Sequence, residues 1–353
     1  MTALTAPAPG RQTGRRPPVP WRNLAWVTWR QHRAALAGTA ALLGGLSLWM
    51  LINGLLVRSA MNSLGLGSCH PITASRCATQ LQTFAGEGYP GTANTFTGVL
   101  QAVPALIGVF VGGPLLAREL ETGTFRFAWT QGCGRLRWIT AKLVPLAILV
   151  TAGAAGMSLV TSWYSQPFSA AGLTGVFRPT LFDLRGVGFG GWTLAAFAIA
   201  AFAGVVIRRT VPAMAAAAGA WAGLFAVTTL YLRAHYQAPL TGKASAGLGG
   251  SGVPWTLNHW MTGPGGHVVS QPGTVIAQGL AALARQGKLG RGAAYGPTPA
   301  IQHWLAQHGY VTWVSYQPAS RFWHFQLIEG GWLLALSVIL VAATIWLVHR
   351  RSA

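Results

Sequence analysis

Long apolar stretches alternate with short charged ones along the whole chain. Six stretches of 19 to 23 residues contain no Asp, Glu, Lys or Arg, although the 353-residue chain has 25 basic and 5 acidic residues. A helix rises about 1.5 Å per residue, so each stretch can cross a hydrocarbon layer of about 30 Å. The pattern predicts an all-α integral membrane protein with six transmembrane helices, at 35–57, 97–117, 143–163, 187–207, 211–232 and 330–348.

The distribution of basic residues predicts the orientation of these helices. Fifteen of the 25 Lys and Arg residues lie in the 67 residues on one side of the predicted membrane, and ten lie in the 159 residues on the other. Cytoplasmic loops carry the excess of cations, so we expect both termini inside (N-in/C-in). A net charge of +20 often indicates nucleic acid, but cations placed beside spans indicate anionic membrane lipids, and we expect no nucleic-acid partner.

The segments before the first span differ in character. Residues 1–19 are rich in proline and are expected to form a disordered cytoplasmic tail, with 20–348 as one six-helix domain. From Trp21 to Arg33 the pattern predicts a helix lying in the headgroup region, with Trp21 and Trp29 on its apolar face and Arg22, Arg30 and Arg33 opposite. A solvated leader is the alternative. The first span is too long for the core of a cleavable signal peptide, so we expect an uncleaved anchor.

The fourth and fifth spans are rich in alanine and glycine, which lets neighbouring backbones approach closely. Only three residues separate these spans, so they should form an antiparallel hairpin.

The long segment 233–329 is predicted to be an extracytoplasmic loop. It opens with a flexible stretch rich in glycine and serine, and two short amphipathic helices should follow. Their apolar positions are Val275, Ile276, Leu280 and Leu283 in the first, and Ile301, Trp304 and Leu305 in the second, which Pro299 would begin. We expect a small cap or a re-entrant element and no independent domain.

Two cysteines stand in the first predicted outer loop. Cys69 and Cys77 would close a nine-residue loop in an oxidising location, which stabilises by roughly 2–3 kcal/mol on a chain-entropy estimate. A disulfide is the favoured interpretation, and free thiols are the alternative.

The predicted cytoplasmic loop 118–142 has the most informative local sequence. It holds two of the five acidic residues, a helix-breaking Gly123, and an amphipathic piece with Phe125, Phe127 and Trp129. Such a piece suits a short helix that lies across the membrane base and meets a partner. An ordinary charged loop beside lipid headgroups is the alternative interpretation.

This loop resembles the first cytoplasmic loop of type-2 ABC transporter permeases. The shared pattern is Glu-x-Glu-x-Gly-Thr, then Arg-x-Arg, then Lys at the start of a span. The segment Ala-Trp-Thr-Gln-Gly is similar to the sequence of actinobacterial members. The resemblance implies a coupling loop that docks on a separate ATPase subunit. Relatives often have proline before the basic pair, where this chain has Gly132-Cys133-Gly134. The implied coupling residues are Glu119, Glu121, Gly123, Thr124, Arg126, Arg135, Arg137 and Lys142.

The sequence shows no motif for enzymatic chemistry. No Gly-x4-Gly-Lys-Ser/Thr is present, so we expect no cofactor in this chain and ATP bound by the partner subunit. Histidines in 233–329 could suggest a zinc or copper site, but His303 and His308 are five residues apart and do not share a helix face. Hydrogen-bonded interfacial histidines are the favoured interpretation, and we expect no metal.

These expectations combine into one functional hypothesis. The chain would be the membrane-spanning subunit of an ATP-driven ABC exporter in the bacterial cytoplasmic membrane, working as a homodimer or with a paired permease. A lipid-like or amphiphilic substrate is expected, because no buried carboxylate is foreseen that could bind a cation. The alternative is a membrane sensor or scaffold whose outer segment 233–329 binds a ligand.

Overall fold

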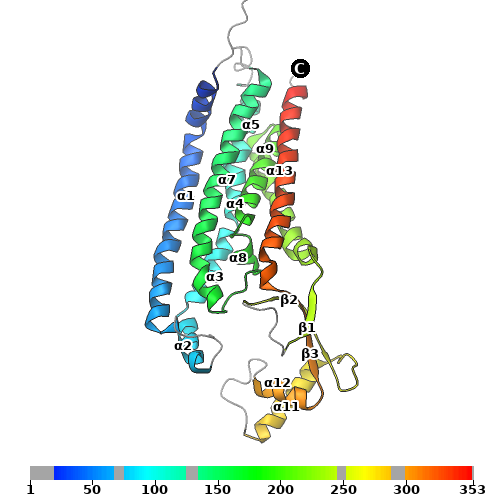
Figure 1. The fold of residues 1–353 in the computed structure, drawn as a ribbon. Helices are drawn as coiled ribbons and strands as arrows, with labels where there is room; N and C mark the ends of the chain where they lie inside the picture. The colour runs from blue at the N-terminus through cyan, green and yellow to red at the C-terminus, as the bar shows by residue number, and fades with distance from the viewer. Residues whose placement is uncertain (1–19, 67–74, 125–133, 245–251, 288–298, 352–353) are drawn as a thin grey trace, which may run out of the picture.

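The computed structural model describes residues 20–66, 75–124, 134–244, 252–287 and 299–351. Within these residues, six helical stretches are long and apolar enough to cross a membrane, and they lie side by side in one bundle (Figure 1). The prediction of an all-α membrane protein with six transmembrane helices is therefore confirmed. The stretches are Trp21–Ser63, Tyr89–Thr122, Arg135–Ala170, Gly188–Ile207, Thr210–His235 and Ala319–Arg350.

Several spans extend well beyond the predicted apolar stretches. The third, α7 (Arg135–Ala170), begins eight residues before the predicted start, so part of the predicted loop 118–142 is helical. Charged residues can form the first turns of a membrane-spanning helix. Those turns lie outside the hydrocarbon layer, where a charge has a low free-energy cost. The last span, α13 (Phe322–Arg351), likewise starts at an aromatic segment and ends on basic residues.

The second span is built from several helical pieces. It comprises α3 (Tyr89–Leu100), α4 (Val103–Ile107), a π-helical turn at Gly108–Gly112 and α5 (Gly113–Thr122). Pro104 and Pro114 lie near the starts of α4 and α5, and proline cannot donate the hydrogen bond that a continuous α-helix needs there.

The N-terminal segment differs from the prediction. The structure has one continuous helix, α1 (Trp21–Ser63), so no separate helix lies in the headgroup plane. The sequence joining the two expected pieces, Ala34-Ala35-Leu36-Ala37, consists of strong helix formers and offers no glycine or proline at which the chain could turn. Residues 1–19, predicted to be disordered, lie outside the described residues.

Helix α9 (Gly188–Ile207) occupies the centre of the bundle and packs against α4, α5, α7, α10 and α13. Its alanines at 195, 196, 198, 200 and 201 are buried, as the small-residue pattern predicts. The approach is closest at the π-helical turn. A methyl group on Gly108 would lie 2.6 Å from the backbone of Ala196, and one on Gly112 would lie 2.8 Å from the carbonyl oxygen of Phe197.

Helix α10 (Thr210–Val227) runs antiparallel to α9 and continues through a π-helical turn at Thr228–Leu232. The additional residue in such a turn rotates the following side chains by roughly 100° around the axis. Arg233 follows immediately, and its side chain is buried inside the bundle.

A small cap, residues 236–318, projects from one end of the bundle (Figure 1). The predicted helices are confirmed as α11 (Pro272–Arg285) and α12 (Pro299–Gln307). The cap also contains an antiparallel sheet that the sequence interpretation missed. Its strand order is β1 (Leu240–Lys243), β3 (Val311–Gln317), β2 (Trp255–Thr262), so the strand that comes last in the sequence is central. Short helices α2 (Ser75–Gly86) and α8 (Pro179–Phe182) lie at the same end of the bundle.

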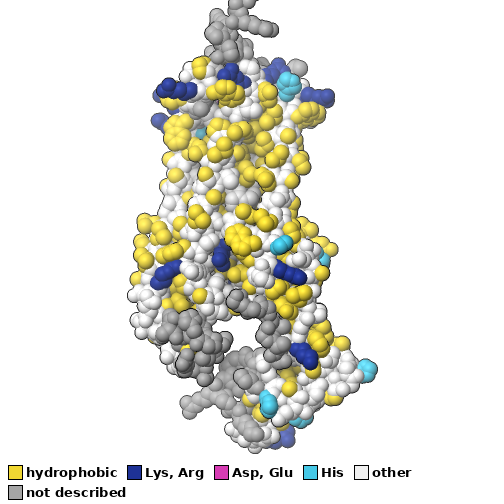
Figure 2. Space-filling view, in the orientation of Figure 1, with side chains coloured by type: hydrophobic (Ala, Val, Ile, Leu, Met, Phe, Trp, Pro, Cys, Tyr) yellow, Lys and Arg dark blue, Asp and Glu magenta, His cyan; other side chains and the backbone are white. Residues whose placement is uncertain are grey.

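The two ends of the bundle both carry basic side chains and differ in shape. Lys and Arg side chains gather at both ends of an apolar belt on the face shown in Figure 2. We call the end that carries the start of α1, the end of α5, the start of α7 and the end of α13 the basal end. The opposite end, which carries the cap, is the cap end.

Candidate functional site

A buried ion pair joins α5 to α7 at the basal end. The ammonium group of Lys142 donates to Oε1 of Glu119, and the two side chains are 4% and 18% exposed. The same ammonium lies 4.8 Å from the centroid of the Trp138 ring. This contact ties the helix that precedes residues 125–133 to the helix that follows them.

A second acidic side chain joins α5 to α10. Oε2 of Glu121 accepts hydrogen bonds from the backbone N–H of Thr210 at 2.9 Å and from its hydroxyl at 2.7 Å. Thr210 is the first residue of α10, so the carboxylate satisfies a free N–H at the positive end of that helix. Just beyond it, Gly123 ends α5 in the left-handed conformation (φ 70°), which glycine adopts without strain.

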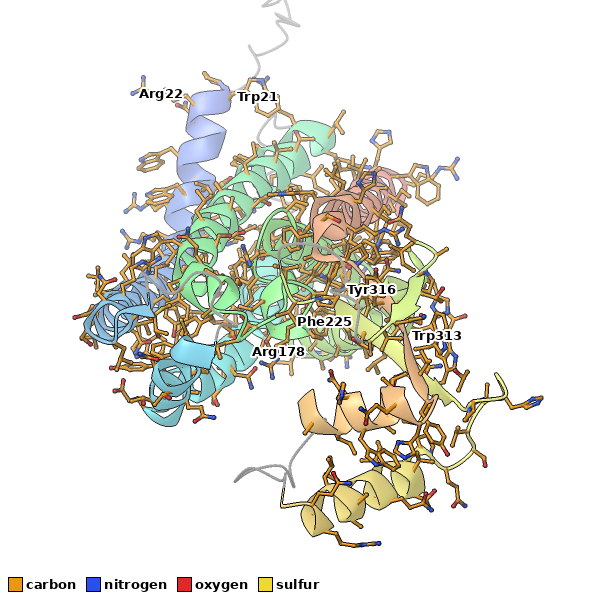
Figure 3. All side chains as sticks on the ribbon, turned by 60° about the horizontal axis from the view of Figure 1, so that its bottom comes forward. Trp21, Arg22, Arg178, Phe225, Trp313 and Tyr316 are labelled. Carbon is orange, nitrogen blue, oxygen red and sulfur yellow. The ribbon has the colours of Figure 1, made fainter. Side chains whose placement is uncertain are left out.

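The start of α1 packs on the start of α7. The guanidinium of Arg137 stacks 4.7 Å from the centroid of the Trp21 ring, and the hydroxyl of Thr28 donates to the carbonyl oxygen of Ala141 at 3.3 Å. Figure 3 shows Trp21 and Arg22 at the exposed tip of α1. Trp29, Arg30 and Arg33 are also exposed, so the predicted amphipathic segment belongs to the membrane-spanning helix itself.

The structure thus brings the predicted coupling residues together in part. Glu119 contacts Lys142, Glu121 contacts α10, and the hydroxyl of Thr124 lies 3.1 Å from that of Thr122. Arg135 is half-buried in the first turn of α7. Arg126, together with Phe125, Phe127 and Trp129, lies outside the described residues.

One of the two cysteines of the predicted disulfide lies within the described residues. Cys77 is fully buried in α2 and is disulfide-bonded. Cys69 lies outside the described residues.

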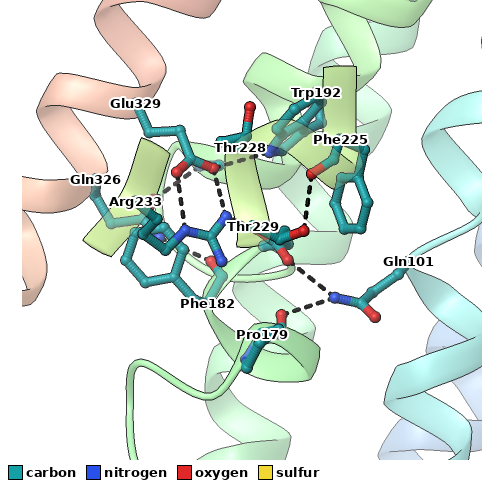
Figure 4. Close-up of polar contacts among 12 residues, drawn as sticks. Gln101, Pro179, Phe182, Trp192, Phe225, Thr228, Thr229, Arg233, Gln326 and Glu329 are labelled. Carbon is teal, nitrogen blue, oxygen red and sulfur yellow. Dashed lines mark hydrogen bonds and ion pairs between the residues drawn. The ribbon is translucent and has the colours of Figure 1, made fainter. Parts of the chain in front are cut away.

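A buried cluster of charged residues lies at the cap end, which corrects the expectation that no carboxylate would be buried. Arg233 Nε and Nη2 donate to Oε2 and Oε1 of Glu329 at 3.0 and 2.8 Å (Figure 4). Nη2 of the same guanidinium also donates to Oδ1 of Asp183. The exposed fraction is 3% or less for each of these three side chains.

Neutral groups complete the hydrogen bonding of both carboxylates. Glu329 accepts from the indole N–H of Trp192 at 2.9 Å and from the hydroxyl of Tyr236 at 3.1 Å. Asp183 Oδ2 accepts from the side-chain amide of Gln101 at 2.9 Å. The cluster therefore connects α3, the loop before α9, α9, α10 and α13, with every carboxylate oxygen bonded.

The cluster has one more acid than base. Burial raises the pKa of Asp183 from its ordinary value near 3.8 to about 6, against the opposing effect of Arg233. Asp183 thus holds a proton more tightly in the folded protein than in the unfolded chain, because a second ionised carboxylate beside Glu329 would leave a buried excess negative charge.

Sequence reasoning gave Asp183, Arg233 and Glu329 no role. One signal was available. The chain has only five acidic residues, and in a membrane protein an acid near the end of a span needs a partner. The separation of the partners along the chain, 50 and 96 residues from Arg233, hid their identity.

Neither end of the bundle shows a catalytic arrangement within the described residues. No group of three or more His, Cys, Asp or Glu side chains there could hold a metal ion. His308 stacks on Trp304 with 4.0 Å between ring centroids and bonds to its carbonyl oxygen, which fits the interfacial role predicted for the histidines. Instead, polar contacts at each end fix several helices to one another.

A comparison with known families identifies the class of membrane protein to which the chain belongs. A family profile described as "ABC-2 membrane transporter related" matches residues 40–233, more than half of the chain. The chain belongs to this family. No curated protein and no solved structure matches it. The permease is therefore a multi-pass membrane component of an ABC transporter. The matched region begins within α1 and ends at Arg233, so the whole cap and all of α13 lie beyond it.

Proposed function

We propose that this permease is the membrane-spanning subunit of an ATP-driven exporter in the bacterial cytoplasmic membrane, and that a separate ATPase subunit binds at its basal end. The family supports a permease component, and the excess of cations near the basal end supports a cytoplasmic location for it. ATP would be bound by the partner. The segment Ala-Trp-Thr-Gln-Gly resembles actinobacterial sequences, which supports an actinobacterial-like member of the family.

The observation that carries this proposal is the pair of acidic contacts made by α5, the helix that immediately precedes residues 125–133. Glu119 fixes α5 to α7, and Glu121 fixes α5 to α10. A force on the intervening segment would reach three spans at once, because these contacts hold the helix ends as one unit. Closure of the ATPase partners would then tilt the spans and open a path to the outside.

The substrate class follows from the chemistry of the spans. The carboxylates of the buried cluster are bonded to Arg233 and to neutral donors, so they offer no free ligand for a cation. Exposed apolar side chains cover the membrane-facing surface. An amphiphilic or lipid-like substrate is therefore proposed, carried by a homodimer or by this chain with a paired permease, among anionic lipids.

The test is co-expression with an ABC ATPase subunit from the same genome, followed by co-purification and measurement of ATP hydrolysis in liposomes. The two subunits should purify together, and the permease should stimulate hydrolysis. Glu121→Lys places a cation at the positive end of α10, and stimulation should fall about tenfold while membrane insertion persists. The matched control is Glu87→Lys, the same change at an exposed site of the cap end, which should leave stimulation intact.

The alternative, a membrane sensor whose outer segment binds a ligand, has one observation in its favour, a pocket in the cap. Under that function no ATPase would purify with the chain, and hydrolysis would not respond to it.

A further inference from the structure

A groove of about 550 Å³ runs between α1 and α7 in the half of the bundle nearest the basal end. Its lining on α1 extends from Trp29 to Leu43, and Leu149, Val150 and Gly153 line it on α7. Helix α1 lies at the edge of the bundle and packs mainly against α7, so the groove opens toward the surrounding membrane (Figure 1). Its volume is within the range of about 300–1,000 Å³ that small-molecule sites occupy.

The length and depth of the groove match one leaflet of a bilayer. The 14 residues from Trp29 to Leu43 rise by about 21 Å. A bilayer with its headgroups is about 40–45 Å thick, so one leaflet measures roughly 20–22 Å. Arg33 is the last charged residue before the charge-free stretch 34–57, and Trp29 lies one turn closer to the basal end. These two side chains are therefore at the level of the headgroups, and the rest of the groove is at the level of the acyl chains.

The wall on α1 combines one cation with an apolar surface. Its central residues follow one another at spacings of three or four positions and so form one face of the helix. They are Trp29, Arg33, Leu36, Ala40 and Leu43. Thr39, the polar residue of the lining below Arg33, donates its hydroxyl to the carbonyl oxygen of Ala35 in its own helix. Leu43 and Val150 are buried at the floor of the groove and belong to the main core of the bundle.

Polar contacts hold α1 against α7 on both sides of the groove. The hydroxyl of Thr28 donates to the carbonyl oxygen of Ala141 at the basal side, and that of Ser47 donates to the sulfur of Met157 at 3.0 Å on the other side. Between these contacts, the small side chains of the α1 lining leave the two helices apart. A molecule in the groove would therefore complete the packing of an edge helix.

The cation at the headgroup level selects the sign of that molecule. Arg33 is exposed and makes no hydrogen bond, ion pair or ring contact with any described residue. Helix α1 contains no Asp or Glu. The two acidic residues near the basal end are already bound, Glu119 to Lys142 and Glu121 to Thr210. An anion from outside the chain is therefore the group that suits this end of the groove.

A second copy of the chain suits the groove less well. In a symmetric dimer whose two-fold axis is normal to the membrane, equivalent residues of the two copies lie at the same depth. Packing through this face would bring one Arg33 toward the other, and α1 has no acidic residue to offset the repulsion. A phosphate group attached to an acyl chain offers the opposite charge and the matching apolar length.

We propose that this groove binds an anionic phospholipid from the leaflet at the basal end, with its phosphate group at Arg33 and an acyl chain between α1 and α7. Arginine binds phosphate oxygens through charge-assisted hydrogen bonds, and the apolar walls bury the chain. The bound lipid stabilises the position of α1 on the bundle. The site stands independently of the ATPase partner, because it lies between two spans of this chain and outside the contacts of α5.

The experiment uses the full chain in phosphatidylcholine nanodiscs. Two lipid probes with the same diazirine-bearing acyl chain are compared, one a phosphatidylglycerol and one a phosphatidylcholine. After irradiation, mass spectrometry maps the labelled peptides. The anionic probe should label residues 34–43 and 146–153 well above the other spans, and unlabelled phosphatidylglycerol should compete. Equal labelling of the groove by the two probes, or label spread evenly over all spans, would overturn the proposal.

Variants separate binding from folding. Arg33→Gln should weaken groove labelling by the anionic probe about tenfold, the effect of one lost charge-assisted contact. Arg30→Gln is the matched control, since Arg30 is exposed on the same helix but does not line the groove. Ala40→Trp fills the groove and should abolish labelling there, whereas Ala41→Trp, at the next exposed position and outside the lining, should not. Unchanged labelling in both Arg33→Gln and Ala40→Trp would contradict the assignment.

A crosslinking measurement tests the competing occupant. In a Cys133→Ser background, Ala40→Cys places a thiol in the groove, and oxidation in native membranes should leave the chains unlinked because lipid separates them. Disulfide-linked dimers through residue 40 would assign the groove to a second copy and would overturn the proposal. Neither outcome depends on whether an ATPase purifies with the chain.

Discussion

At the scale of single residues, the acidic side chains of this permease fix the contacts between helix ends. The chain has five, and four of them bind a group on another helix or loop: Glu119 binds Lys142, Glu121 binds Thr210, and Asp183 and Glu329 bind Arg233. Each partner lies at the end of a span, where a polar group can be satisfied without crossing the hydrocarbon. These contacts fix which helix ends meet.

The Glu119–Lys142 contact predicts a specific pattern of stability. Removing one partner breaks this largely buried ion pair, so Glu119→Gln or Lys142→Met should each lower the free energy of unfolding by about 3 kcal/mol. The double variant should lose less than the sum of the single variants. Thermal unfolding of the four proteins in detergent gives this comparison, and strictly additive losses would show that the two side chains do not interact.

The raised pKa of Asp183 predicts a pH dependence. The carboxyl titrates near 3.8 when unfolded and near 6 when folded, so its contribution to stability is fully present below pH 3.8 and is lost as the pH rises through 6. The difference corresponds to about 3 kcal/mol. The melting temperature of the wild type relative to that of Asp183→Asn should therefore be higher at pH 5 than at pH 7.5. Asp183→Asn should remove this part of the pH dependence; a variant with the same pH profile as the wild type would contradict it.

At the scale of helices and strands, the sequence predicted what depends on local composition. The six spans follow from charge-free stretches, and α11 and α12 from helical spacing of apolar residues with proline at the start. Three features depend on distant contacts and were not predictable in this way. The sheet pairs residues that lie 49 to 76 positions apart in the sequence, β2 lacks clean alternation, and the Arg233 cluster joins four separate parts of the chain. The continuity of α1 was missed because amphipathic spacing was given more weight than helix propensity.

The contact between the second span and α9 depends on glycine. Gly108→Ala should force Ala196 and the π-helical turn apart and cost about 1–3 kcal/mol, because overpacking in a tight interface is destabilising. Gly156→Ala in α7 is the matched control, since no atom lies within 4 Å of the added methyl group. The melting temperature in detergent should fall for the first variant and stay level or rise for the second. Equal effects would show that the close approach has no energetic role.

At the scale of the whole molecule, the permease has two connected ends with different tasks. The basal end fixes α5, α7 and α10 around the predicted coupling segment, and the Arg233 cluster fixes α9, α10 and α13 at the cap end. Helices α9 and α10 run between the two, so a tilt imposed at one end reaches the other through rigid elements. The cap, attached beyond the cluster, would move with α10 and α13.

This account requires that the basal end faces the cytoplasm, and site-specific labelling tests that directly. In a Cys133→Ser background, Thr124→Cys and His308→Cys each place a thiol at one end of the molecule, both at exposed positions. Intact cells treated with a membrane-impermeant maleimide should label the residue-308 cysteine at once, and the residue-124 cysteine only after permeabilisation. Labelling of residue 124 in intact cells would place the acidic contacts on the outside, where no ATPase could reach them, and would contradict the proposed coupling.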